Sequence, residues 1–395
     1  MTTSDFKLLA SQYKMELLVD VLPFWEKYSI DRENGGFFTC LDRQGNCYDT
    51  DKFVWLQGRQ VWMFSFLYNN FDKREEWLDI ALNGAEFLKK YGRDAEGNFY
   101  FSLTREGKPL IQPYNIFSDC FATMAFSQLA KATGNSEYAD IATDTFNNIL
   151  KRRENPKGKY SKNVPESRPL KGFSLPMILC NLSLETEHLI DKGLVERTIE
   201  ECIHEVMEVF YNHDTGLIHE NVLADGSFSN SYEGRLLNPG HAIEAMWFIM
   251  DLGVRLKDKT LIEKAVEICN RTVEYGWDKD YEGIFYFMDV KGHPVQQLEW
   301  DQKLWWVHME TLISLAKAYK LTHNQTSLAW FKKVHDYTWS HFPDKEFGEW
   351  FGYLNRRGEV LLPLKGGKWK GCFHVPRGLY QCWNTLKDIN PENNE

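Results

Sequence analysis

Glycine-centred segments of similar composition recur along this chain, and this repetition constrains the fold more than any other feature of the sequence. Each copy holds a glycine, a stretch of alternating aromatic residues and a polar turn with a second glycine, which is typical of a short β-hairpin. Successive copies are about 60 residues apart, which leaves room for two helices between them. The copies lie at 33–46, 95–108, 214–227, 281–293 and 347–359, and a degenerate copy at 155–162 falls where a third member is expected.

The stretches between the hairpins predict one outer and one inner helix per unit. A more polar, amphipathic helix precedes each hairpin, as at 74–91 and 259–275. A strongly apolar helix follows each hairpin, and a helix that is apolar on nearly all sides is buried. We therefore predict an all-α protein, an (α/α)6 barrel in which short β-hairpins join the helix pairs at one end. The predicted inner helices are 53–67, 116–132, 173–184, 242–252, 304–319 and 375–385.

The alternative all-helical architecture is a solenoid divided into several domains. A solenoid stacks its repeats in a line and does not require one helix of every pair to be buried on all sides. The chain also has no Gly-, Ser- or Pro-rich linker that would separate domains. Residues 1–395 are therefore expected to form a single barrel domain.

Composition narrows the choice of partners. The net charge of −10 argues against nucleic acid or an anionic membrane surface as a partner. No uncharged stretch is long enough to cross a bilayer, and the first residues do not resemble a secretory signal. Eight cysteines without C-x-x-C spacing fit buried free thiols in a reducing compartment. We expect a cytoplasmic protein.

Two histidines open predicted inner helices at matching positions. His241, in L-N-P-G-H-A-I-E-A-M-W-F, begins the fourth inner helix, and His374, in K-G-C-F-H-V-P-R-G-L-Y, begins the sixth. Because the inner helices of such a barrel run parallel, their N-termini converge at one end around a cavity. The positive end of the helix dipole disfavours a charged imidazole, so both rings are expected to be neutral near pH 7.

Each of these histidines has a charged neighbour three residues later. Glu244 is expected to accept the second ring N–H of His241 and fix its tautomer. Arg377 is expected to keep His374 unprotonated or to bind a ligand oxygen. Two histidines with opposite local charges resemble a matched acid and base, although a single histidine at a helix start is more often a cap or a packing residue.

Charged residues inside two other apolar helices extend the candidate site. Glu310 corresponds to Glu244 in the repeat, and the sequence leaves open whether it forms a buried pair with a basic residue or contacts a ligand. Arg59, in F-V-W-L-Q-G-R-Q-V-W, must likewise meet a carboxylate or a ligand oxygen. Trp305 and Trp306 are either core or cavity residues.

Motifs for metal or nucleotide binding do not stand out. The sequence contains no H-E-x-x-H, C-x-x-C or paired Asp-x-Asp arrangement, so no metal site is expected. The glycine-rich segment 364–371 lacks the spacing of a P-loop. The one dense basic run, 151–162, is either a solvated loop or a site for an anion or a nucleotide phosphate.

Four strings of the sequence together resemble the N-acylglucosamine 2-epimerase family, also called renin-binding protein. They are Q-P-Y-N-I-F-S-D-C-F, L-N-P-G-H-A-I-E-A-M-W-F, Q-L-E-W-D-Q-K-L-W-W-V-H-M-E and G-E-W-F-G-Y-L-N-R-R-G-E-V. The resemblance covers nearly the whole chain and implies the same (α/α)6 barrel. It also implies interconversion of N-acetylglucosamine and N-acetylmannosamine, with no metal or redox cofactor, because the sugar carbonyl activates the C2 hydrogen.

The resemblance implies roles for individual residues. His241 and His374 would be the two bases that act on opposite faces of C2 in the open-chain sugar, through an enediolate. Arg59 would stabilise oxyanion character at C1–C2, Glu310 would orient the substrate, and Glu244 would orient His241. The residues expected to bind the N-acyl hexosamine are Arg377, Trp305, Trp306, Tyr114 and Asn115.

Comparison with the wider superfamily adds further expectations. Cellobiose epimerases and aldose–ketose isomerases carry another histidine on the third inner helix, whereas this chain reads K-G-F-S-L-P-M-I-L-C-N-L there, which favours the N-acyl branch. Members of that branch are activated by ATP that is not consumed, and Lys157, Lys159 and Lys162 are the expected contacts of this allosteric nucleotide. A homodimer is expected, because it would bury an apolar outer helix.

Three alternatives remain open at this point. The first is another aldose 2-epimerase or isomerase of the superfamily. The second is a glycoside hydrolase on the same barrel, with Glu244 and Glu310 as its two carboxylates. The third is an interaction protein without catalysis, as the renin-binding name implies.

Overall fold

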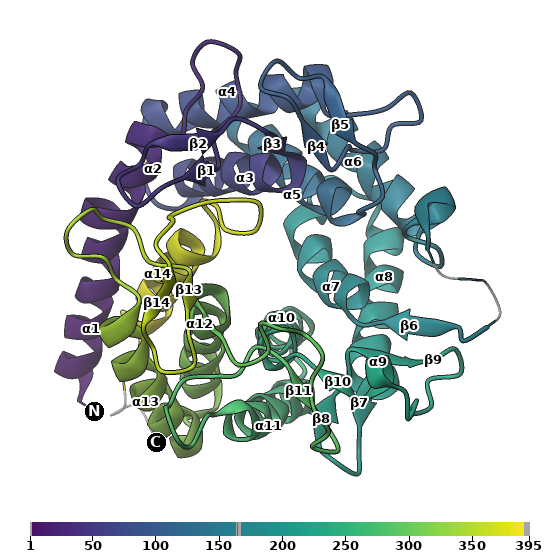
Figure 1. Ribbon diagram of the computed structural model, residues 1–395, viewed down its shortest axis with the longest axis vertical. Coiled ribbons are helices and arrows are strands. Elements are labelled where there is room, and N and C mark those ends of the chain that lie inside the picture. The colour runs from purple at the N-terminus through teal and green to yellow at the C-terminus, as the bar shows by residue number, and fades with distance from the viewer. Residues whose placement is uncertain (1, 163, 165–166, 391–395) are drawn as a thin grey trace.

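The structure, a computed structural model, describes residues 2–162, 164 and 167–390, and its helices form two concentric rings (Figure 1). The inner ring contains α3 (Val54–Asn70), α5 (Phe117–Thr133), α7 (Ser174–Thr186), α10 (Pro239–Leu256), α12 (Trp305–Thr322) and α14 (His374–Leu386). The outer ring contains α1 (Thr3–Met15) continuing through η1 (Glu16–Val21) and α2 (Leu22–Tyr28), α4 (Glu75–Tyr91), α6 (Ser136–Lys151), α8 (Lys192–His204) with η3 (Glu205–Val209), α11 (Lys259–Gly276) and α13 (Gln325–His341). The predicted (α/α)6 barrel is confirmed.

Burial explains why the two helices of each pair occupy different rings. In α5 every residue from Ser118 to Ala130 is buried, so this helix must be covered on all sides. In α4 the buried positions follow one stripe that includes Trp77, Ala81 and Leu88, and the opposite face is polar. Side-chain caps fix several helix starts; Asn238, for example, accepts a hydrogen bond from the backbone N–H of His241 and so sets where α10 begins.

Short antiparallel strands link neighbouring units at one end of the rings. The strand before an inner helix pairs with the hairpin of the next unit, as in the orders β3-β4-β5 and β12-β13-β14. The strands are β1 (Cys40–Leu41), β2 (Cys47–Asp49), β3 (Lys52–Phe53), β4 (Ser102–Leu103), β5 (Pro109–Ile111), β6 (Leu170–Gly172), β7 (Tyr211–Asn212), β8 (Leu217–Ile218), β9 (Asn221–Leu223), β10 (Leu236–Leu237), β11 (Met288–Asp289), β12 (Lys303–Leu304), β13 (Tyr353–Leu354) and β14 (Val360–Leu362).

One predicted hairpin is absent from the described part of the third unit. The degenerate copy at 155–162 forms a single 3-10 turn, η2 (Gly158–Tyr160), instead of two strands. Its sequence is Lys-rich and lacks the alternating aromatic residues that would cover a sheet face. The strand before the third inner helix, β6, pairs with β9 of the following hairpin in the same way as in the other units.

Buried ion pairs repeat at the same end and close the ring. In each case an aspartate that follows an outer helix binds a buried lysine just before the next inner helix and an arginine of a neighbouring hairpin. Paired in this way, buried charges are tolerated. One of these arginines, Arg43, belongs to the first hairpin, so its ion pair with Asp344 connects the last unit of the ring to the first. The three sets are Asp31 with Lys52 and Arg105, Asp278 with Lys303 and Arg356, and Asp344 with Lys365 and Arg43.

Across the part of the chain that the structure describes, every helix is too short or too polar to cross a bilayer.

Candidate active site

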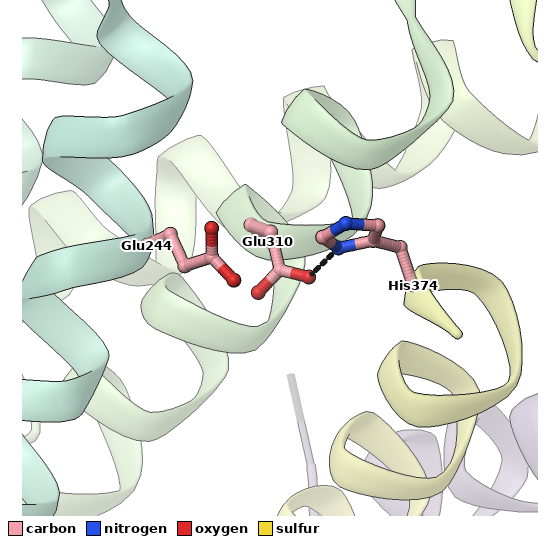
Figure 2. Close-up of side chains that lie close together, drawn as sticks. All are labelled: Glu244, Glu310 and His374. Carbon is pink, nitrogen blue, oxygen red and sulfur yellow. Dashed lines mark hydrogen bonds and ion pairs between the residues drawn. The ribbon is translucent and has the colours of Figure 1, made fainter. Parts of the chain in front are cut away.

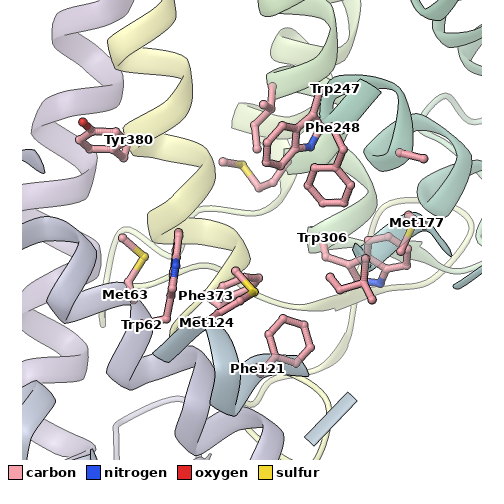
Figure 3. Packing of buried hydrophobic residues seen from close by; sticks show 14 of the residues in the cluster. Trp62, Met63, Phe121, Met124, Met177, Trp247, Phe248, Trp306, Phe373 and Tyr380 are labelled. Atoms are coloured by element: carbon pink, nitrogen blue, oxygen red, sulfur yellow. The ribbon is translucent and has the colours of Figure 1, made fainter. Parts of the chain in front are cut away.

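A cavity of about 500 Å³ lies where the N-terminal ends of the inner helices meet. Its wall is largely aromatic; Phe121 of α5, Met177 of α7 and Trp306 of α12 reach it from three different inner helices (Figure 3). Both predicted catalytic histidines, His241 and His374, line the same cavity. The convergence expected from parallel inner helices is therefore what the structure contains.

Trp306 packs near both imidazoles. Its ring centroid is 5.3 Å from that of His241 and 5.8 Å from that of His374, and it is tilted by about 40° to each. The side chain of His241 is 28% exposed and that of His374 is 8% exposed. The two histidines thus share one aromatic neighbour and line one cavity from α10 and α14, with different access to solvent.

His241 binds a carboxylate that differs from the predicted one. Its Nδ1 lies 3.1 Å from both carboxylate oxygens of Glu220, whereas Glu244 hydrogen bonds to Arg377. The predicted bond between Glu244 and His241 is therefore wrong, because the arginine from α14 competes for the carboxylate. Glu220 was missed by sequence reasoning; its only signal is its place beside His219 at the end of an apolar strand, in I-H-E-N-V.

The charges around His241 also contradict the expectation of a neutral ring. Burial by itself lowers the pKa of His241, but the carboxylates of Glu220 and Glu244 outweigh it and raise that pKa above its ordinary value. The N-terminal dipole of α10 was expected to decide the charge state. The structure adds two nearby carboxylates, which act in the opposite direction because they stabilise the protonated form of this imidazole.

His374 lies in an opposite electrostatic environment. Its Nδ1 is 2.7 Å from Oε1 of Glu310 (Figure 2), yet its pKa is lowered well below the ordinary value. Burial is the largest cause, and the guanidinium groups of Arg59 and then Arg377 add to it against the opposing effect of Glu244. The expected influence of Arg377 on this ring thus has the predicted direction. His374 remains a neutral imidazole that can accept a proton.

Arg377 holds two carboxylates together beneath the site. One of its terminal nitrogens lies 2.5 Å from Oε1 of Glu244 and 2.6 Å from Oε1 of Glu310. Arg377 does not line the cavity that contains the two histidines; it lines a smaller one of about 230 Å³ on its other side. The position of Arg377 therefore does not support the prediction that it binds substrate, since its guanidinium already forms ion pairs with two carboxylates of the protein.

Glu310 also lies behind the cavity wall. It is fully buried, and it accepts hydrogen bonds from His374, Arg377 and the indole N–H of Trp247. Of the two interpretations left open by the sequence, the structure contains the buried pair with a basic residue. Because both of its oxygens already accept hydrogen bonds and the residue is fully buried, Glu310 is placed to position His374 and not to meet a substrate hydroxyl.

The cluster of Glu244, Glu310 and His374 has the spacing of a metal site but not its chemistry. One ligand atom from each lies within 4.8 Å of the others. The guanidinium of Arg377 already bonds to both carboxylates, and a divalent cation at the same place would meet that positive charge. We therefore interpret the three residues as a support for His374.

Arg59 is placed to contact a ligand in the cavity. Its side chain lines the cavity, and its guanidinium carbon lies 4.5 Å from the ring centroid of Trp55, 4.0 Å from Phe121 and 4.9 Å from Phe373. Its Nε is buried without a hydrogen-bond partner. Burial lowers the pKa of Arg59 to about 9. A cation held by aromatic rings and lacking an anionic partner is well placed to bind an oxygen of a ligand.

Two predicted tryptophans and several other aromatic residues complete the wall. Trp305 and Trp306 both line the cavity, as does Trp369 from the glycine-rich segment 364–371. In that segment Lys365 and Lys370 are fully buried and bind Asp344 and Glu349, which explains why it does not serve as a phosphate site. His308, ambiguous in sequence, accepts the N–H of Ile284 and contacts the carbonyl of Leu304, which is a structural role.

Tyr114 and Asn115 lie outside this cavity, contrary to the prediction that they bind the substrate. They line a neighbouring cavity of about 490 Å³, which shares Phe117 and Ser174 with the first. The side chain of Asn115 accepts the N–H of Phe117 at the start of α5, and the ring of Tyr114 packs 5.1 Å from that of Phe101. These local contacts turn both side chains away from the histidines.

The predicted nucleotide-binding lysines are only partly gathered at this second cavity. Lys157 lines it, together with Arg153 and Lys171. Lys159 is exposed and lies 3.7 Å from Glu96, and Lys162 is exposed at the edge of the described segment.

A family model and several relatives identify the family of this chain, and solved structures support its fold. The family model of N-acylglucosamine 2-epimerase (GlcNAc 2-epimerase) matches residues 36–376. The chain is 41% identical over 378 residues to the N-acylglucosamine 2-epimerase of Mus musculus, covering 93% of this chain and 89% of that protein. Its identity to the Homo sapiens protein of the same name is 39% over 375 residues, with 93% and 87% covered. The solved structure of cellobiose 2-epimerase from Bacillus thermoamylovorans B4167 superposes with a TM-score of 0.83 at 20% identity, covering 97% of this chain and 100% of that one.

Proposed function

The chain belongs to the N-acylglucosamine 2-epimerase family, and from this premise we propose that it is a sugar isomerase that interconverts N-acetylglucosamine and N-acetylmannosamine. These sugars differ only in the configuration at C2. The observation that supports the proposal most directly is that His241 and His374 line one cavity in opposite electrostatic environments. One is favoured as an acid and the other as a base, which is what inversion of a C–H centre requires.

We propose a proton transfer through each imidazole. In the open-chain sugar the C1 carbonyl makes the C2 hydrogen acidic, so neutral His374 removes that proton and an enolate forms with its charge on O1, because C2 carries the acylated nitrogen and no hydroxyl. Protonated His241 then delivers its proton to the opposite face of C2, and the C1 carbonyl is restored. The reverse reaction uses the two histidines in exchanged protonation states. Arg59, whose buried cation has no carboxylate partner among the described contacts, would stabilise the negative charge that develops on the enolate oxygen O1.

A glycoside hydrolase on the same barrel is a weaker interpretation of the site. Hydrolysis requires two carboxylates that flank the scissile bond, one of them free to donate a proton. Glu244 and Glu310 instead share one cation, Arg377, and Glu310 is fully buried behind His374. Glu244 does line the cavity with the two imidazoles, but its carboxylate is paired with Arg377, and Glu310 does not reach the cavity.

Product identification tests the proposed activity. Purified protein is mixed with N-acetylmannosamine in deuterated water, and the sugars are separated and examined by NMR. We expect N-acetylglucosamine that carries deuterium at C2. Release of another product, or an unlabelled epimer, would contradict the proposed proton transfer. An unchanged sugar with a folded protein would favour the interaction-protein alternative.

We propose that a nucleotide such as ATP acts as an allosteric activator in the second cavity. Its support is the basic side chains of Lys157 and Lys171 and a wall shared with the catalytic cavity through Phe117 and Ser174. Glu154 and Glu205 also line this cavity and oppose anion binding there. A Lys157→Ala/Lys171→Ala double variant is expected to lose activation by ATP while keeping the activity measured without nucleotide. Activation that survives the double change would place the effector elsewhere.

A homodimer in the cytoplasm is the assembly and location that we propose. Three exposed apolar side chains, Leu8, Met15 and Val19, follow one face of α1 and η1 with exposed fractions of 73%, 53% and 64%. A second copy of the chain would cover this stripe. The exposed thiol of Cys47 suits a reducing compartment. Light scattering on a Leu8→Glu/Val19→Lys variant should report a monomer if the stripe forms the interface.

A further inference from the structure

Glu220 is a largely, but not fully, buried carboxylate whose partner is a histidine. Both of its oxygens lie 3.1 Å from Nδ1 of His241, and its side chain is only 11% exposed. Within the residues that the structure describes, no lysine or arginine forms an ion pair with it. Removing a carboxylate from water costs free energy unless a partner stabilises its charge. The imidazole of His241 is the partner that Glu220 faces.

The backbone of Glu220 is fixed by the segments that start two inner helices. Its carbonyl accepts the N–H of Phe173, directly before α7, and its N–H donates to the carbonyl of Leu236 in β10, which leads into α10. The next residue, Asn221, pairs with Gly172 in the β9–β6 ladder. The position of this side chain is therefore set by the same elements that carry His241 to the cavity.

We propose that Glu220 is the positioning residue of His241: it accepts the Nδ1 proton, so that Nε2 is the nitrogen presented to the substrate. The inference rests on the proposed function for the role of His241, but the contact itself is independent of it. In a neutral imidazole one nitrogen donates and the other accepts, and the partner of the first decides which one is free. Glu244 cannot replace Glu220, because it is bound to Arg377.

Glu220 also makes His241 different from His374. The titratable groups that face His241 are Glu220 from the β8–β9 connection, Glu244 from α10 and His374 from α14. Burial alone would lower the pKa of His241, and Glu220 supplies the largest opposing effect. Removal of its charge leaves a partly buried imidazole with a lower pKa, which would hold a proton for delivery to C2 in a smaller fraction of the molecules.

The test compares Glu220→Gln with a matched surface control, Glu208→Gln. Glu208 lies 3.6 Å from His213, but both side chains are more than half exposed. Nitrogen-15 NMR of histidine-labelled protein reports the tautomer and the pKa of His241 without any need for turnover. In Glu220→Gln we expect the pKa of His241 to fall by about one to three units and the Nδ1–H tautomer to lose its dominance. In Glu208→Gln the signals of His241 should not move.

Kinetics supply the second readout. We expect Glu220→Gln to lower kcat by about 10–100-fold with a smaller change in KM, and Glu220→Asp to restore part of the loss. Because the equilibrium constant between the two sugars is fixed, kcat/KM must fall by the same factor in both directions. Unchanged tautomer and pKa of His241 in Glu220→Gln would overturn the inference, whatever the activity.

Two further outcomes separate this inference from the proposed function. If the pKa of His241 shifts as expected but the wild-type protein does not epimerise N-acetylmannosamine, the positioning role stands and the proposed function fails. If Glu220→Gln does not fold, Glu220→Asp is measured by the same NMR criterion, since the shorter side chain withdraws the carboxylate from Nδ1. An unchanged pKa in Glu220→Asp would then count against the inference.

Discussion

The two histidines of the cavity occupy equivalent positions in the repeat but have opposite surroundings. His241 at the start of α10 faces the carboxylate of Glu220, and its pKa is raised. His374 in the first turn of α14 also contacts a carboxylate, Glu310, yet its pKa is lowered. The difference lies in the cations: Arg377 neutralises Glu310, and Arg59 adds a second positive charge near His374. A repeat can therefore supply two similar imidazoles, and the residues behind them can assign one as acid and one as base.

The largest expected effect is the loss of either histidine. His241→Asn and His374→Asn should each lower epimerisation by about 10³-fold or more, because each would remove the only base on one face of C2. The melting temperature should change little in both variants. Assays of the two variants side by side, with thermal unfolding as the control, check this. If either variant keeps most of the activity, the histidine that was replaced is not a catalytic base, and the proposed pairing of acid and base is wrong.

Loss of the shared cation should weaken the fold as well as the site. Arg377→Met leaves Glu244 and Glu310 buried without their cation, and we expect a decrease of about 3–5 kcal/mol in the free energy of unfolding. A matched control is Arg255→Met, since Arg255 also binds two glutamates but at the surface, where loss should cost about 1 kcal/mol or less. Chemical denaturation measures both. Equal costs for the two variants would show that Arg377 is not the support of His374.

The carboxylate behind His374 should matter less than the ring itself. Glu310→Gln keeps a hydrogen-bond acceptor near Nδ1 but removes the charge that Arg377 neutralises, and we expect kcat to fall by about 10–100-fold. The effect on KM should be small, because Glu310 does not line the cavity. Steady-state kinetics check this. A large rise in KM with unchanged kcat would contradict this role and would indicate that Glu310 binds the substrate.

The dependence of activity on pH should show the asymmetry directly. The proposed active form has neutral His374 and protonated His241. Because the pKa of His374 is lowered, mild acid leaves that base neutral. As the pH rises through the raised pKa of His241, the acid loses its proton, so kcat/KM should fall on the alkaline side, about tenfold for each pH unit beyond that pKa. A profile that falls in mild acid and stays flat in alkali would reverse the assignment of the two histidines.

The sequence predicted the fold well because burial determines it. Inner helix 242–252 was recognised from its apolar residues, and the structure extends it to Pro239–Leu256, since Asn238 caps it and Pro239 fits its first turn. The predicted third hairpin does not form, because residues 155–162 contain the glycine but lack the alternating apolar residues of a strand. Glycine alone permits a turn and does not build a strand.

The sequence repeat predicts which helix ends meet at the candidate site, but it does not predict which side chains bind one another there. The meeting of His241 and His374 follows from parallel inner helices. The partners of the two histidines do not follow from it, because the nearest charge along a helix is not the nearest charge in space. Glu244 forms an ion pair with Arg377, which lies two inner helices away around the ring. Glu220 comes from a hairpin, and its contact with His241 depends on strand pairing that the local sequence does not reveal.

The account rests on the claim that the two imidazoles serve opposite faces of one carbon. Deuterium exchange at C2 of each sugar, followed by proton NMR in deuterated water with His241→Asn and His374→Asn, tests it most directly. A variant with one remaining base can still exchange the C2 hydrogen of the epimer that faces that base. We predict that each variant exchanges only one of the two sugars, and that the two variants exchange different ones. Exchange of the same sugar by both variants would contradict the claim.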